Sequence, residues 1–310
     1  MGTDAAVAKI ALTGSAEAHG QRHAHLLADY WALTKPDVNF LIAITVLASF
    51  CLARPATLPG FPLALLAHAV LGSLLLAGGA GALNQVLELR FDSQMRRTSR
   101  RPLVTGGISP VRALWLGVLV SAGGAAYLAY VVNPLSSLIA GLTLVSYLAI
   151  YTPLKRKTPL CTLIGALPGA SPPLIGWAAA SGHLSLEAWT LYSTLFLWQF
   201  PHFMAIAWMY REDYDRAGYK VLPGGEGRHR FVAVQSFLPA LLLVPVSLIP
   251  AFLGDEGHTY LVGAALLGLA FLYYAARLAI YRSNAIARQL LLASILYLPT
   301  LFLLALLSRI

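Results

Sequence analysis

The run Leu301-Phe302-Leu303-Leu304-Ala305-Leu306-Leu307 contains no polar side chain and shows no alternation of apolar and polar positions. A second run, Leu241-Leu242-Leu243-Val244, has the same character. Strands of a membrane barrel would alternate, because one face meets lipid and the other meets the lumen. A helix needs roughly 20 apolar residues to cross the hydrocarbon core, and stretches of that length recur along this chain. The sequence therefore predicts an all-α polytopic membrane protein.

The composition of the 310-residue chain excludes a water-soluble globule. Hydrophobic residues make up 58% and charged residues only 11%, against roughly 25% charged residues in soluble domains. Residues 1–36 are expected to form an N-terminal tail, and residues 37–310 a single transmembrane domain. The nine expected spans in this domain are 37–54, 62–89, 112–131, 135–151, 160–181, 185–209, 231–252, 259–280 and 286–308.

The 22 Lys and Arg residues are distributed according to a topology. Twenty of them lie before the first span or after every second span, which is one side of the membrane, and only Arg54 and Arg309 remain for the opposite side. By the positive-inside rule, the N-terminus is cytoplasmic and the C-terminus external, which requires an odd number of spans. The isoelectric point of about 9.7 follows from this topology, and nucleic-acid binding is not expected. Contact with lipid headgroups is the simplest role for many of these cations.

Three further features of the sequence have structural interpretations. Cys51 and Cys161 fall at opposite ends of their spans, so we expect no disulfide between them. The run Gly78-Gly79-Ala80-Gly81 favours close helix packing. A terminal cluster of three histidines could bind a metal, although a disordered tail is the stronger interpretation; its members are His19, His23 and His25.

Asn84, Glu88 and Asp92 recur every four residues where the second span ends, so they share one helix face. Carboxylates beside hydrocarbon need a partner, which makes intramembrane acids candidates for a functional site. Mg²⁺ suits this set, because it binds one or two carboxylates and takes its other oxygens from water and substrate phosphate. The alternative is a structural ion pair with a nearby arginine: Arg90, Arg96 or Arg97.

A second acidic segment, residues 210–219, follows the sixth span on the same side of the membrane. Solvated loop charge is the simpler interpretation, but a bundle could bring this segment to the first acidic cluster. Cations on the same side could then bind phosphate oxygens, the arginines through a two-pronged fork: Arg97, Arg101, Lys155 and Arg156. The sequence contains no glycine-rich phosphate loop.

Three segments in order resemble signatures of the UbiA-type intramembrane prenyltransferases, and within that family those of the members that farnesylate haem. The first is residues 84–103, with its Asn, Glu, Asp, Met, Arg, Thr and Arg-Pro-Leu positions. The second is residues 151–177, which begins Tyr151-Thr152-Pro153-Leu154-Lys155. The third is residues 198–218, which begins Trp198-Gln199-Phe200-Pro201-His202-Phe203. Asp37 and Cys161 depart from the family pattern, which usually has Arg and Asn there.

This resemblance implies nine transmembrane helices around a central cavity open to lipid, in a bacterial inner membrane. It implies transfer of the farnesyl group from farnesyl diphosphate to haem B, with Mg²⁺ as cofactor and with haem O and diphosphate as products. Haem B would be a substrate and not a prosthetic group. Haem A synthase or oxidase assembly factors are further possible partners.

The same resemblance, with the chemistry of the motifs, implies roles for individual residues. The metal ligands would be Asn84, Glu88, Asp92 and Asp213. Tyr151 would act in catalysis, with Phe200 and Tyr210 as further aromatic candidates to face an allylic cation. Packing or an aromatic belt at the interface is an equal alternative for each aromatic residue. The substrate-binding residues would be Arg97, Arg101, Lys155, Arg156, Arg216, His202 and Trp198.

Two other functions are compatible with parts of this pattern. A family member that prenylates an aromatic ring, such as hydroxybenzoate or a chlorophyll precursor, would share the acidic motifs. A transporter or haem-handling assembly factor would also be polytopic with basic cytoplasmic loops. For His202, a packed core or capping histidine is the alternative to ligation of haem iron.

Overall fold

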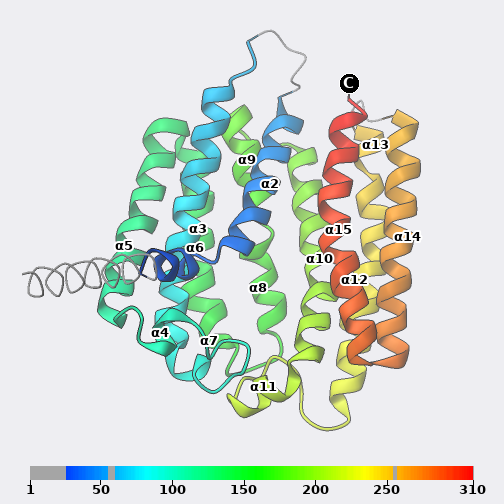
Figure 1. Ribbon diagram of the computed structural model, residues 1–310. Helices are drawn as coiled ribbons and strands as arrows, with labels where there is room; N and C mark the ends of the chain where they lie inside the picture. The colour runs from blue at the N-terminus through cyan, green and yellow to red at the C-terminus, as the bar shows by residue number, and fades with distance from the viewer. Residues whose placement is uncertain (1–25, 55–59, 254–256, 310) are drawn as a thin grey trace, which may run out of the picture.

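The computed structural model describes residues 26–54, 60–253 and 257–309, and the regular structure in these ranges is helical throughout. The long helices run side by side in one bundle (Figure 1). The terminal histidine cluster lies outside the described residues. The elements, in chain order, are α2 (Pro36–Ala53), α3 (Leu63–Asp92), α4 (Pro102–Thr105), α5 (Pro110–Tyr127), η1 (Leu128–Val132), α6 (Pro134–Val145), η2 (Ser146–Tyr151), α7 (Thr152–Leu154), α8 (Cys161–Gly169), α9 (Pro172–Ser181), α10 (Leu186–Met209), α11 (Arg211–Arg216), α12 (Gly227–Leu248), α13 (Pro250–Leu253), α14 (Gly257–Tyr281) and α15 (Asn284–Leu307).

The predicted all-α membrane bundle is confirmed. Within the described residues, eight helical segments are long and apolar enough to cross a bilayer. The remaining predicted span corresponds to α10, which has 24 residues but carries Gln199 and His202, and these lower its hydropathy. The predicted span 160–181 is broken between α8 and α9, because Pro172 and Pro173 lack the amide hydrogens that a continuous helix would need.

Helix α10 lies in the interior of the bundle, where it packs against α12 and α15. Its buried side chains belong to the largest apolar cluster, which includes Trp198, Met204 and Trp208. On the other side of the bundle, α3 packs along α5, and α2 packs along α9. Large apolar side chains such as Phe40 and Leu266 are more than 60% exposed, which suits a surface in contact with lipid tails.

The predicted close packing at the glycine run of α3 is confirmed. A Cβ at Gly79 would lie 2.6 Å from the backbone nitrogen of Ser121 on α5. Gly117 of α5 lies just as close to α3, since a Cβ there would be 2.7 Å from Leu83 Cγ. The two helices therefore approach so closely that only glycine fits at these contacts.

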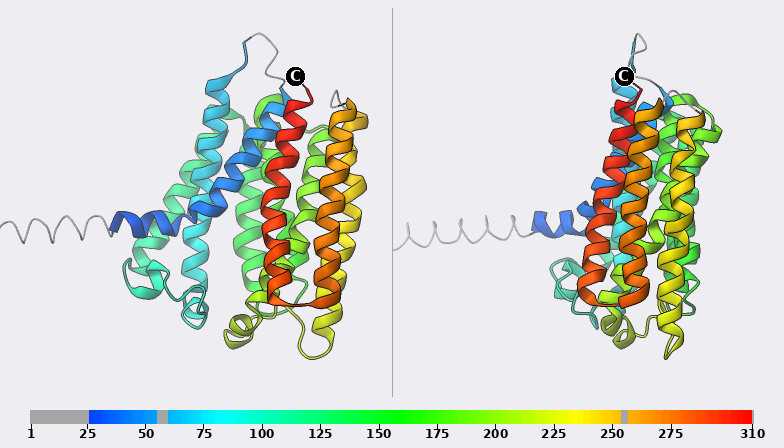
Figure 2. Two further views of the ribbon diagram at one scale, coloured as in Figure 1. Left: turned by 45° about the vertical axis from the view of Figure 1, so that its right-hand side comes forward. Right: turned by 90° about the vertical axis from the view of Figure 1, so that its right-hand side faces the viewer.

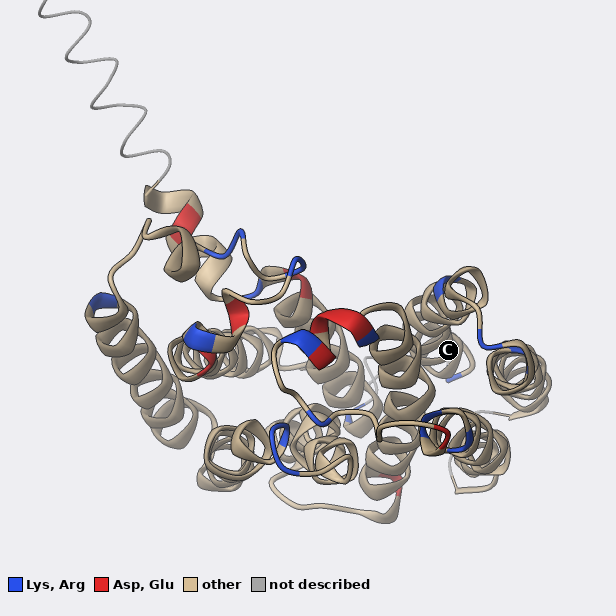
Figure 3. Ribbon diagram, turned by 90° about the horizontal axis from the view of Figure 1, so that it is seen from below, with Lys and Arg blue, Asp and Glu red and all other residues tan. Residues whose placement is uncertain are grey.

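Charged side chains gather at one end of the bundle, where α3 ends and α4 and α11 lie (Figure 3). We call this the charged end. Helices α2 and α15 both finish at the opposite end, where the guanidinium of Arg309 donates to the carbonyl of Leu52. Cys51 and Cys161 are both free thiols, at the last turn of α2 and the first residue of α8.

A short helix over residues 26–33 lies across the bundle axis before α2 begins (Figure 2). Leu33 is fully buried in a small apolar cluster with Ala82 of α3 and Leu103 of α4, whereas Leu27 and Trp31 are exposed. Exposed apolar side chains that include Trp, on a helix lying across the bundle axis, are typical of a helix in the membrane interface. The chain turns from this helix into α2 at Lys35.

Candidate active site

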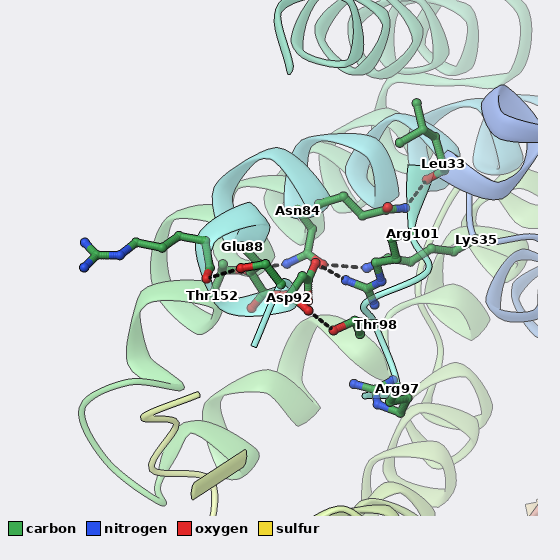
Figure 4. A network of polar contacts seen from close by, with 12 residues as sticks. Leu33, Lys35, Asn84, Glu88, Asp92, Arg97, Thr98, Arg101 and Thr152 are labelled. Atoms are coloured by element: carbon green, nitrogen blue, oxygen red, sulfur yellow. Dashed lines mark hydrogen bonds and ion pairs between the residues drawn. The ribbon is translucent and has the colours of Figure 1, made fainter. Parts of the chain in front are cut away.

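The predicted polar face of α3 lies inside the protein at the charged end. Asn84, Glu88 and Asp92 are 1%, 6% and 1% exposed, so all three point into the bundle. They meet side chains from three other segments, as Figure 4 shows. The four-residue spacing therefore presents one continuous row of oxygen ligands along the last two turns of the helix.

Each carboxylate of α3 pairs with a cation that the sequence associates with phosphate. Lys155 Nζ lies 2.8 Å from Glu88 Oε1, and the Arg101 guanidinium donates to Asp92 Oδ2. The alternative partners Arg90, Arg96 and Arg97 form no ion pair with these acids among the described residues. Burial opposes the charge of Lys155, but the Glu88 carboxylate outweighs it and raises the pKa of Lys155. The ammonium group is therefore held charged next to the acid.

Asp92 keeps one oxygen without a partner. Its Oδ1 atom is buried and has no hydrogen bond within the described part of the chain. The backbone carbonyl of Asp92 accepts from Thr98 Oγ1 at 2.8 Å, which turns the following loop back over the end of α3. A buried carboxylate oxygen left unpaired is costly, so a water molecule or an ion is expected to contact it.

The second acidic segment comes to the same end of the bundle, as expected. Asp213, on α11, accepts a hydrogen bond from the backbone nitrogen of Arg97 at 3.2 Å and pairs with Arg216 at 3.1 Å. Its contacts therefore join α11 to the loop that follows α3. Asp215 forms a two-pronged pair with Arg228, which leaves it in the loop network outside the row on α3.

The other two cations assigned to phosphate lie over aromatic rings. The Arg97 guanidinium is 5.5 Å from the centre of the Tyr210 ring, and that of Arg156 is 4.8 Å from the centre of Phe91. Neither of them forms an ion pair with an acid of the described chain. Both guanidinium groups thus keep donors that can pair with an anion.

Tyr151 lies beneath Lys155, whose Nζ atom is 4.6 Å from the centre of the ring. Gly165 of α8 makes room for this ring, because a Cβ there would overlap Tyr151 Cδ2. The ring of Tyr147 stacks beside it at 5.7 Å. An electron-rich surface therefore lies directly next to the Glu88–Lys155 pair.

Trp198 and His202 belong to a different part of the molecule. Their rings stack at 4.7 Å, and both are bound to Ser294 on α15. Trp198 Nε1 donates to the Ser294 carbonyl at 2.9 Å, and His202 Nδ1 lies 2.7 Å from Ser294 Oγ. No polar contact within the described chain joins them to the acids of α3. The haem-binding role implied for this pair stays a prediction.

Lys35 is part of the site although its sequence position suggested only a topology signal. Its Nζ atom donates to Asn84 Oδ1 at 2.5 Å and lies 3.5 Å from the hydroxyl of Tyr147. Burial, followed by the nearby Arg101 charge, lowers the pKa of Lys35 to about 7. Asn84 is completed by Thr152, whose hydroxyl accepts from Nδ2 at 3.2 Å. The lysine was missed because its contact bridges residues far apart in sequence.

The donor atoms along α3 suit a hard cation. They are carboxylate and amide oxygens, the ligands of Mg²⁺, and the unpaired Asp92 Oδ1 adds a free position. Within the described ranges, no three His, Cys, Asp or Glu side chains are close enough to hold a metal by themselves. A magnesium ion would therefore need Asn84, water or substrate phosphate to complete its coordination.

A cavity of about 200 Å³ lies elsewhere, among α8, α10 and α12. It is mainly apolar, and its lining includes Phe196, Phe200 and Phe231, with Gln235 and Thr162 as polar groups. Phe200 therefore faces this space, and not the acidic row on α3. Asp37 is exposed in the first turn of α2, so this departure from the family pattern lies outside the polar network.

Comparison with known proteins matches residues 42–306 to the model of the UbiA prenyltransferase family. A protoheme IX farnesyltransferase from Solibacter usitatus is 46% identical over 289 residues, which cover 91% of this chain and 99% of that protein. A protoheme IX farnesyltransferase from Koribacter versatilis is 43% identical, over 92% of this chain and 94% of that protein.

Two solved structures share the fold. A structure of a digeranylgeranylglyceryl phosphate synthase matches with a TM-score of 0.74 at 16% identity, over 91% of this chain and 98% of that one. A UbiA homologue from Archaeoglobus fulgidus, bound to GPP and Mg²⁺, matches with a TM-score of 0.61 at 18% identity, over 89% and 99%. The family resemblance found in the sequence is thereby confirmed, and the chain belongs to the UbiA prenyltransferase family.

Proposed function

We propose that this membrane enzyme transfers the farnesyl group of farnesyl diphosphate to a vinyl group of haem B, forming haem O for respiratory oxidases. The observation that supports this most is the row of two buried acids on α3, each paired with a cation, at one end of a membrane bundle. The names of the relatives, which are 46% and 43% identical over nearly their whole length, give the acceptor.

The reaction balances without an oxidant or reductant. The bond between C1 of the farnesyl group and the diphosphate oxygen breaks, and the diphosphate leaves with the electron pair. The allylic carbon then forms a bond to the vinyl group of haem B. Water adds its oxygen to the resulting carbocation and releases a proton, which leaves a hydroxyethylfarnesyl side chain.

Asn84, Glu88, Asp92 and Asp213 would hold magnesium, as the all-oxygen donor set and the unpaired Asp92 Oδ1 suggest. When bound, Mg²⁺ neutralises charge on the diphosphate, as a Lewis acid does at phosphoryl oxygens. The archaeal homologue bound to GPP and Mg²⁺ supports the same cofactor here.

The cations of the site would stabilise the leaving diphosphate. Arg101 and Lys155 already lie against the acids, while Arg97 and Arg156 keep free donors over aromatic rings. Arg216, which pairs with Asp213, would bind at the edge of the same anion. Charge that develops on the diphosphate oxygens is thus met by donors fixed in advance, which lowers the barrier to ionisation.

Aromatic faces would protect the allylic cation once it forms. Tyr151, stacked beside Tyr147 and below Lys155, is the candidate closest to the diphosphate cations. Trp198 and His202 would contact the porphyrin, since their stacked rings are held rigidly by Ser294. An enclosed apolar environment keeps water away from the cation until the carbon–carbon bond has formed.

The direct test uses purified protein in detergent with haem B, farnesyl diphosphate and Mg²⁺, with haem O detected by mass and absorption. Haem O should accumulate with one diphosphate released per turnover. Prenylation of a phenolic acceptor such as hydroxybenzoate, without haem O, would instead support the other branch of the family. Transport of haem across the membrane of reconstituted vesicles, without release of diphosphate, would support a transporter.

The cytoplasmic membrane of a bacterium is the proposed location, with the charged end and the N-terminus in the cytoplasm. The one-sided Lys and Arg distribution supports this orientation. The test replaces Cys51 and Cys161 by Ala and introduces Ser99→Cys in the exposed loop after α3. Labelling by an impermeant maleimide in inside-out vesicles, and none in intact spheroplasts, is expected; the reverse pattern would overturn the orientation.

Haem A synthase or oxidase assembly factors are proposed partners that take up the product.

A further inference from the structure

Lys35 is held in a backbone conformation that lysine rarely adopts. Its φ and ψ angles of 54° and 64° are left-handed, and it directly precedes Pro36. Side chains with a Cβ are disfavoured in this region, and a following proline restricts the backbone further toward extended forms. Such a conformation persists only where the surrounding structure imposes it, and it is found most often at functional sites.

Contacts from α3 and α2 impose this conformation. Gln85 Nε2 donates to the Leu33 carbonyl at 3.1 Å, and Asn39 Nδ2 donates to the Thr34 carbonyl at 2.9 Å. Gly81 lets the turn approach α3, because a Cβ there would lie 3.2 Å from the Thr34 carbonyl oxygen and 3.4 Å from Lys35 Cγ. The turn is therefore fixed on the same part of α3 that carries the acids, with the lysine directed at the site (Figure 4).

The partners of Lys35 differ from those of the other cations beside α3. Lys155 pairs with Glu88 and Arg101 pairs with Asp92, whereas Lys35 contacts only the neutral oxygens of Asn84 and Tyr147. No carboxylate of the described residues forms an ion pair with it. An ammonium group whose partners are all neutral gains little in return for its partial burial, so Lys35 can turn to an anion without giving up an ion pair.

We propose that Lys35 is a diphosphate-binding residue, which the turn between the interface helix and α2 holds against the end of α3. This inference rests on the proposed function, because it names the anion that the site receives. Movement of Nζ from Asn84 Oδ1 to a diphosphate oxygen would replace an ion–dipole contact by an ion pair. The same movement would free the amide oxygen of Asn84 for its own role in the site.

The experiment compares Lys35→Met with Lys157→Met, which removes the same charge from an exposed position on the neighbouring loop. Lys35→Met should raise the KM for farnesyl diphosphate and the inhibition constant of inorganic diphosphate at least about tenfold. The KM for haem B and inhibition by farnesol, which lacks the diphosphate, should change less than about twofold. Lys157→Met should match the wild type, and Lys35→Arg should recover most of the affinity.

Lys35→Gly distinguishes a diphosphate-binding role from a structural one. It removes the cation and also relieves the strain of the left-handed backbone, which glycine adopts readily. Its melting temperature should equal or exceed that of the wild type, while its affinity for diphosphate falls as in Lys35→Met. Diphosphate binding at the wild-type level in either variant would overturn the inference, as would an equal loss of diphosphate, farnesol and haem affinity. If the wild type bound diphosphate through Lys35 but formed no haem O, only the proposed acceptor would be wrong.

Discussion

The two parts of α3 contact their neighbours in different ways. In the first part, glycines such as Gly72 and Gly79 lie so close to η1 and α5 that a Cβ would overlap side-chain or backbone atoms. In the last two turns, Glu88 and Asp92 contact cations from distant segments through charged groups. One helix therefore joins a tightly packed apolar contact to a buried ionic one.

This difference sets the effect that a substitution has in each part of the helix. Close packing stabilises the bundle, since dispersion contacts and helix association depend on the fit. Buried ion pairs contribute little net stability, because desolvation offsets their attraction. Removal of one acid nevertheless leaves its partner cation buried and unpaired, so neutralising substitutions at the charged end should lower both turnover and stability. Added volume in the first part of the helix should affect folding and leave substrate affinity unchanged.

The largest effect is expected when the acids are neutralised. Glu88→Gln and Asp92→Asn keep the side-chain shape, but they remove the charges that hold Lys155 and Arg101 and that would bind magnesium. Each should lower haem O formation and diphosphate release by about 10²–10³ or more, as removal of one transition-state contact does. Single-turnover assays would measure the rate, and melting curves in detergent would measure the stability.

Glu212→Gln is the matched control for these variants. Glu212 is an acid on α11 near the same end of the bundle, but its side chain is 81% exposed, so its loss should leave the rate unchanged. Retention of wild-type turnover by Asp92→Asn would remove the acidic row from the mechanism. A transporter or binding protein would form no haem O even as the wild type, and its handling of haem would be unchanged in both variants.

A smaller effect, on stability, is expected in the first part of α3. Gly79→Ala places a Cβ 2.6 Å from the Ser121 nitrogen, so α3 and α5 must separate. Overpacking of this kind costs about 1–3 kcal/mol, which should lower the melting temperature while the protein that remains folded keeps its KM values. Gly123→Ala on α5 is the control, because nothing lies within 4 Å of its Cβ. Equal melting temperatures for both variants would contradict the close contact.

Features that depend on local periodicity could be predicted from the sequence. The spacing of Asn84, Glu88 and Asp92 indicated one buried face, and the structure has all three inside. The glycine run indicated a close helix contact, which α5 provides. Both follow from the geometry of a single helix, which holds wherever that helix packs.

Pairings between distant segments could not be predicted in the same way. Lys155 and Arg101 were assigned to phosphate alone, but they also pair with the acids, and Lys35 was assigned only to topology. Such contacts depend on how the turns at 35 and 155 fold over α3. The break between α8 and α9 was missed because apolar composition continues through Pro172. Periodicity predicts which face of a helix is buried, but it does not predict which side chains from distant segments contact that face.

The smallest effect is expected at Ser294, far from the acidic row. Ser294→Ala removes the hydroxyl that lies 2.7 Å from His202 Nδ1, but it keeps the carbonyl that accepts from Trp198 Nε1. Loss of one hydrogen bond, about 0.5–1.5 kcal/mol, should raise the KM for haem B by a few-fold and leave that for farnesyl diphosphate unchanged. Ser193→Ala removes an exposed hydroxyl that bonds only to its own helix and should change neither value. A loss of farnesyl diphosphate affinity in Ser294→Ala would mean that the Trp198–His202 pair contacts the isoprenoid chain, and the division between a diphosphate region on α3 and a haem region on α10 would be wrong.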